Sequence, residues 1–156
     1  MAASWVSPVS RNPPILSVAI ARTRHTYNYI VKHREFAICI LPSDLIEKIH
    51  FLGTVSGREV RDKIATAGLT KTRARKIGCP VIEESIAVLE CKLFTTILAG
   101  DHDLVLGEVI EAYAKEGIEP PNPAKYPIPM HVGGDRYTTP STNVIEVKQI
   151  HHQRTS

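Results

Sequence analysis

The segment Leu98-Ala99-Gly100-Asp101-His102-Asp103-Leu104-Val105 joins two apolar runs through a short polar apex. The preceding run, from Ile86 to Leu98, is long and rich in β-prone residues, and a second apolar run follows the apex. Two such runs around a polar, glycine-containing turn are typical of a β-hairpin. We therefore expect one long hairpin, with Glu90 and Lys92 of its first arm facing solvent opposite Cys91.

The apex of this hairpin places the imidazole of His102 at the rim of a sheet, between the carboxylates of Asp101 and Asp103. Histidine gains and loses a proton near neutral pH, which makes His102 a candidate catalytic residue. A solvent-exposed turn histidine would show the same spacing, so the apex by itself leaves both interpretations open.

The rest of the chain alternates short strand patterns with short helix patterns. Strands are expected over 2–10, 15–21, 36–41 and 143–150, and helices over 26–33, 43–53 and 60–67. Thr26 and Ser43-Asp44 are the expected helix N-caps. The prolines between Glu119 and Pro129 predict an extended tether. Without any βαβ alternation, the pattern indicates a single mostly-β domain over 1–156, an antiparallel barrel with inserted helices.

Composition narrows the class of protein. The 156 residues are 43% hydrophobic and 22% charged with a net charge of +3, which is ordinary for a globular protein. No apolar run is long enough to span a bilayer and no signal peptide is visible, so we expect no membrane partner and a cytoplasmic location. The three cysteines include no C-x-x-C pair, and Cys39 and Cys91 lie in strand patterns as expected buried, inert thiols.

Several other classes of site lack support in the residues. There is no G-x-G-x-x-G after a strand, no P-loop and no H-x-x-x-H pair, so neither a Rossmann nucleotide site nor a metal site is expected. The basic cluster Lys71–Lys76 is interpreted as a solvated face, although it could also hold a phosphate group. Nucleic-acid binding is not favoured, because no aromatic residues interleave with the charge.

An ordered set of short motifs resembles one family. The set comprises Ala3-Ser4-Trp5-Val6-Ser7-Pro8-Val9-Ser10 with Pro13-Pro14, Thr26 with its basic neighbours, Glu35-Phe36, Ser56-Gly57-Arg58 before Asp62-Lys63, and Gly100-Asp101-His102 before Gly107-Glu108-Val109. Over residues 2–137 it is similar to the flavin reductase-like FMN-binding split-barrel proteins, which include flavoredoxin and archaeal ferric reductases. The resemblance implies a Greek-key split β-barrel. It also implies that the family's first strand would precede Met1, so that either the start is assigned too late or the strand is missing, and that 138–156 form a C-terminal strand and tail.

The resemblance further implies a site for FMN at the interface of a homodimer. The peptide nitrogens of Ala3, Ser4, Trp5 and Val6 would donate to the edge of the isoalloxazine ring, where reduction places charge. Trp5 would either stack on that ring or pack in the dimer core. One phosphate-binding wall would be Arg22, Arg24 and Thr26, and the other Ser56, Gly57 and Lys63. Tyr137 would reach the flavin of the partner subunit.

By the same resemblance, His102 would stand on the open face of the flavin, where a nicotinamide docks, with Asp101 capping the turn. The function implied is an FMN-dependent oxidoreductase that takes electrons from NADH or NADPH. Free flavin, ferric iron or a redox protein would be the acceptor. The alternative is a non-enzymatic FMN electron carrier that a partner protein reduces. A third hypothesis is an interaction module without flavin.

Overall fold

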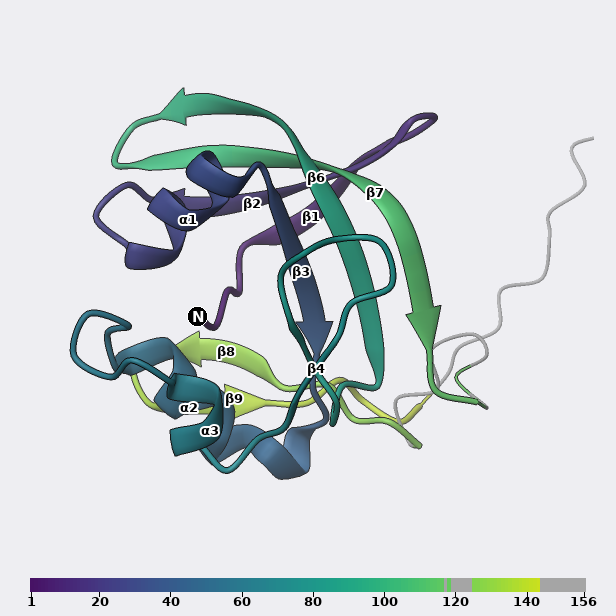
Figure 1. The fold of residues 1–156 in the computed structure, drawn as a ribbon. Coiled ribbons are helices and arrows are strands. Elements are labelled where there is room, and N and C mark those ends of the chain that lie inside the picture. Colours follow the sequence, from purple (N-terminus) through teal and green to yellow (C-terminus); the bar gives the residue numbers. More distant parts are fainter. Residues whose placement is uncertain (117, 119–124, 144–156) are drawn as a thin grey trace, which may run out of the picture.

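The computed structural model describes all residues of the chain except 117, 119–124 and 144–156. Its main sheet is antiparallel and has the strand order β1-β2-β7-β6-β3. The bounds are β1 Val6–Arg11, β2 Pro14–Ala21, β3 Glu35–Ile40, β6 Ala87–Ala99 and β7 His102–Ala114. The outer strands β1 and β3 do not pair with each other, so the sheet stays open (Figure 1). Helices inserted between curved strands make this the predicted split barrel.

The long hairpin is confirmed. Strands β6 and β7 pair along their whole length up to Ala99 and His102, which flank the turn. Gly100 at the turn has φ +71°, a left-handed conformation that costs glycine little and other residues more. The end of β2 lies on the far side of β7, with Ala21 opposite His102. The hairpin apex and the end of β2 are therefore neighbours.

The first helix, α1 His25–His33, follows β2 directly. Its N-cap is Arg24 and no side chain caps it, so the prediction that Thr26 is the cap is wrong by two residues. Thr26 lies inside the first turn instead.

The segment after β3 begins with a 3-10 turn, Ser43–Leu45, and continues as α2 Ile46–Thr54. The predicted Ser43-Asp44 cap is therefore wrong, and α2 runs through Gly53 to Thr54.

The last expected helix is a single turn, α3 Lys63–Thr66, rather than 60–67. Asp62 accepts a hydrogen bond from the amide of Ala65 at 3.2 Å, which fixes its start. Gly68, with φ +64°, ends this turn as predicted.

Two small hairpins complete the described chain. Strands β4 Lys71–Thr72 and β5 Val81–Ile82 pair with each other, as do β8 Met130–Gly133 and β9 Arg136–Thr138. Figure 1 shows β8 and β9 together with α2 and α3 below the main sheet, and the N-terminus between the two layers. The predicted strand over 143–150 and most of the tether over 119–129 lie outside the described residues. No helix of the described chain has the length and apolarity needed to cross a membrane.

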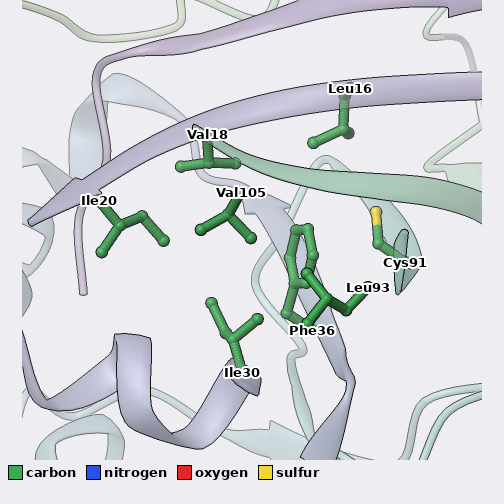
Figure 2. Close-up of a cluster of buried hydrophobic side chains, with 8 residues drawn as sticks. All are labelled: Leu16, Val18, Ile20, Ile30, Phe36, Cys91, Leu93 and Val105. Atoms are coloured by element: carbon green, nitrogen blue, oxygen red, sulfur yellow. The ribbon is translucent and has the colours of Figure 1, made fainter. Parts of the chain in front are cut away.

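The largest of three buried hydrophobic clusters in the described part of the chain lies between the sheet and α1. Leu16, Val18 and Ile20 alternate along β2 and point to the same side as Val105 of β7 (Figure 2). Figure 2 shows Ile30 of α1 facing them, with Phe36, Leu93 and Cys91 closing the other end. Burying side chains of this size stabilises the fold by about 1.5–3 kcal/mol each. This cluster packs against the end of β2 and the start of β7, the two strand ends that carry the site.

The predicted exposure of Glu90 is wrong: its side chain is completely buried. The alternation along β6 holds, with Cys91 and Leu93 on the face toward α1 and Glu90 on the other face with Val88. That second face is covered around Val88 by Ala74, Ile77 and Val81, which buries Glu90, while Lys92 stays exposed as predicted. The carboxylate of Glu90 accepts hydrogen bonds from the amides of Arg75 and Lys76, each at 2.7 Å. The segment Lys71–Lys76 thus exposes its charged side chains to solvent, as predicted, but turns its backbone toward Glu90.

Candidate functional site

A crevice of about 230 Å³ opens where the N-terminal segment, the end of β2 and the hairpin apex meet. These parts come together because β2 pairs on both sides: the amide of Ala19 donates to the carbonyl of Trp5 at 3.0 Å, and Ala21 lies opposite His102. The lining consists of Met1, Ala2, Ala3, Ser4, Trp5, Ala19, Ile20, Ala21, Arg24, His102 and His131. Of the predicted site residues, the crevice unites Ala3, Ser4, Trp5, Arg24 and His102.

His102 is oriented by its neighbour in the turn. Its Nδ1 lies 2.8 Å from Oδ1 of Asp101, and because an ionised carboxylate only accepts hydrogen bonds, Nδ1 carries the proton. The hydrogen bond from His102 holds the pKa of Asp101 below its ordinary value. The Asp101 carboxylate, expected to cap the turn, therefore fixes the imidazole and leaves Nε2 for a ligand.

Trp5 forms the aromatic side of the crevice. Its ring centroid lies 5.0 Å from that of His102, with 44° between the planes. The residue is 65% exposed, so nothing in the described chain covers its outer face. A ring stacked on Trp5 and a second subunit packed against it would each provide that cover.

The two predicted phosphate walls face each other. Burial first, and then the positive charge of Arg24, lower the pKa of Lys63. Gly57 of the second wall lies against the turn that carries the first wall, since a Cβ built on it would lie 3.1 Å from Cδ2 of His25 and 4.0 Å from Cδ of Lys63. Among the residues that the structure describes, neither Arg24 nor Lys63 has a carboxylate within ion-pair distance. Two cations brought together without an acid are stabilised by a bound anion.

Unlike Arg24 and Lys63, Arg22 forms an ion pair with a carboxylate of the protein. Its Nε donates to Oδ1 of Asp103 at 2.8 Å, and the hydroxyl of Tyr27 donates to Oδ2 at 2.6 Å. The Asp103 side chain is only 3% exposed. These donors, Tyr27 first, hold the pKa of Asp103 below its ordinary value although burial opposes them. The sequence analysis missed this role of Asp103 and Tyr27.

The remaining predicted residues are not part of the crevice lining. Val6 begins β1, and the Oγ of Ser56 accepts a hydrogen bond from the amide of Arg58 at 3.1 Å. Tyr137, on β9, has its hydroxyl 3.0 Å from Nδ1 of His50, and its ring packs against His131. His131 itself lines the crevice, so the β8–β9 hairpin forms part of its wall.

Comparisons with known proteins agree with this geometry. A family model described as a flavin reductase-like domain matches residues 1–139. An uncharacterized protein of Aeropyrum pernix is 42% identical over 113 residues, which cover 72% of this chain and 43% of that protein. The NADH:riboflavin 5'-phosphate oxidoreductase of Streptomyces pristinaespiralis is 30% identical over 125 residues, covering 76% of this chain and 64% of that one. The chain thus spans less than two thirds of both relatives.

A solved structure shows the same fold. The FMN-binding protein from Thermus thermophilus with bound p-hydroxybenzaldehyde aligns with a TM-score of 0.83 and 28% identity, covering 93% of this chain and 79% of that chain. The open antiparallel sheet, the ordered motifs and the extent of the family match lead to one conclusion. The chain belongs to the flavin reductase-like family.

Proposed function

We propose that this protein binds FMN and acts as an oxidoreductase that takes electrons from NADH or NADPH. The observation that carries the proposal is the crevice, which brings Arg24 together with the exposed ring of Trp5 and the oriented imidazole of His102. FMN, when bound, accepts a hydride equivalent and passes the electrons on. The proposal is supported by the FMN-binding protein and the NADH-dependent enzyme among the relatives.

The residues present suit the two ends of FMN. The phosphate would lie between two sets of residues that offer cations, hydroxyls and backbone N–H groups. One set is Arg22, Arg24 and Thr26, and the other is Ser56, Gly57 and Lys63. The absence of a side chain at Gly57 keeps this space clear. The peptide nitrogens of Ala3 to Val6 would face the ring.

A second copy of the chain would complete the site. The crevice of about 230 Å³ is smaller than the roughly 300–1,000 Å³ usual for cofactor pockets. Large apolar side chains are exposed around it and along the neighbouring hairpin, namely Trp5, Val6, Val9, Phe94, Ile97 and Leu98. Apolar surface of this extent usually marks an interface. A homodimer would cover Trp5 and bring Tyr137 toward the flavin of the partner.

His102 would work at the open face of the flavin. Asp101 holds its Nδ1, so Nε2 can position the nicotinamide donor or hold a proton there. Free flavin, ferric iron or a redox protein would then receive the electrons. The three cysteines are free thiols, which is in keeping with a reducing cytoplasm.

Flavin binding and reduction can be measured separately. We expect the purified protein to bind added FMN in a fluorescence titration, and NADH or NADPH to bleach the flavin absorbance without oxygen. Absence of FMN binding would refute the proposal as a whole. Tight binding without bleaching by either nucleotide would refute the enzyme and favour an electron carrier that a partner protein reduces.

A further inference from the structure

Asp103 is a buried charge at the edge of the crevice that the proposed chemistry does not use. It follows His102 in β7 and points to the opposite face of the strand, toward the core side of α1. An unpaired carboxylate in such a place is costly, so its partners decide what it does. Both partners, Arg22 and Tyr27, come from the same short stretch far away in the sequence.

That stretch carries the first phosphate wall. Arg22 and Tyr27 stand on either side of Arg24, whose backbone is held by two hydrogen bonds. The amide of Arg24 donates to the carbonyl of Ala21 at 2.9 Å, and the amide of Tyr27 donates to the carbonyl of Arg24 at 3.0 Å. Because it is bonded to Arg22 and Tyr27, Asp103 anchors to the sheet both ends of the turn that carries Arg24.

We propose that Asp103 is a positioning residue for phosphate recognition: by holding Arg22 and Tyr27 it keeps the turn from Arg22 to Thr26 in place opposite Lys63. The inference rests on the proposed function, since the anion it serves is the FMN phosphate. Asp103 does not touch the ligand in this scheme. It acts through the guanidinium of Arg22 and through the first turn of α1.

This assignment explains why the position is charged. Ile20, directly opposite Asp103 on β2, is an ordinary core residue, and an apolar residue at 103 would pack there at no electrostatic cost. A carboxylate is needed only if two donors must be held in a fixed direction. Two charged or polar partners at 2.8 and 2.6 Å supply that direction.

The test compares FMN with riboflavin, which has the same ring and no phosphate, by calorimetric titration of the full chain. The variants are Asp103→Asn and Tyr27→Phe, the second of which keeps the packed ring and removes the hydroxyl that donates to Asp103. Loss of a residue that orients a metal ligand weakens metal binding about 10- to 100-fold, and we take this scale for a residue that orients a phosphate-binding turn. We expect the preference for FMN over riboflavin to fall at least about tenfold in both variants, with riboflavin affinity within about twofold of the wild type.

Tyr29→Phe is the matched control, because it removes an exposed hydroxyl from the same helix. It should leave both affinities unchanged. Equal losses of FMN and riboflavin affinity in the Asp103 and Tyr27 variants would overturn the inference, since a merely structural role affects both ligands. An unchanged preference would also overturn it. If the wild type binds neither flavin, the proposed function fails and the inference fails with it. If the wild type prefers FMN and the variants keep that preference, only the inference fails.

Discussion

Replacing Glu90 by glutamine tests whether its buried carboxylate holds the loop between β4 and β5 against the sheet. Oε1 accepts from the amide of Arg75 at 2.7 Å, and Oε2 accepts from Lys76 at 2.7 Å and Ile77 at 3.3 Å. Glutamine keeps the volume and one accepting oxygen, so it can serve the two amides that share Oε2. Its NH₂ group then meets the amide of Arg75, donor against donor.

The cost follows from these contacts. A hydrogen bond to a charged acceptor contributes about 1.5–3 kcal/mol, so losing one and weakening two should destabilise the fold by about 2–3 kcal/mol. With a urea dependence of about 2 kcal/mol per M, the unfolding midpoint should fall by about 1 M. Lys92→Gln, two residues along the same strand and exposed, is the control and should shift stability by less than about 0.5 kcal/mol.

The pH dependence gives a second measurement. Burial pushes the pKa of Glu90 upward, but the three loop amides together with a hydrogen bond from Tyr113 outweigh it and hold the pKa below its ordinary value of 4.5. A lowered pKa in the folded state means that the contribution is complete above the unfolded pKa and is lost as pH falls through the folded one. The wild type should lose this stability below about pH 4.5, and Glu90→Gln should lack that loss. The urea midpoints are measured by far-UV circular dichroism. Equal midpoints for Glu90→Gln and Lys92→Gln would refute the reasoning.

Three further changes have expected outcomes. His102→Ala should lower the rate of flavin bleaching by NADH or NADPH at least about tenfold while FMN stays bound, and an unchanged rate would contradict its role. Gly107→Ala should destabilise by about 3 kcal/mol in thermal unfolding, because its Cβ would lie 2.4 Å from Cζ of Phe36, whereas Gly100→Ala, with nothing within 4 Å, should cost only about 1 kcal/mol of backbone strain. Burial above all raises the thiol pKa of Cys79 to about 11 and of Cys91 to about 12, so mass spectrometry should find both unalkylated by iodoacetamide at pH 8 in the native protein and modified in urea.

The parts of the fold that were predictable are those where one local pattern decides. The hairpin of β6 and β7 follows from two β-prone runs around Gly100, and the end of α3 follows from Gly68. The predicted starts of α1 and α2 were wrong. Thr26 and Ser43 have the right chemistry for an N-cap, but Arg24 is the N-cap of α1 and a 3-10 turn precedes α2. Capping residues predict that a helix is near more reliably than they predict where it begins.

Glu90 and Asp103 show where sequence patterns stop being informative. Glu90 was assigned to solvent because alternation puts it opposite Cys91, but the segment from Ala74 to Val81 covers that face of the sheet too. Backbone amides of this segment, 13 to 15 residues earlier in the chain, satisfy the carboxylate. Asp103 shares a strand face with the fully buried Val105, so its need for a partner was visible in the sequence, whereas the identity of Arg22 and Tyr27 was not. A charge on a buried strand face therefore predicts that a distant donor exists, and only the folded chain names it. In this protein the distant donors flank Arg24, and our proposal that Asp103 positions this turn for the FMN phosphate follows from that placement.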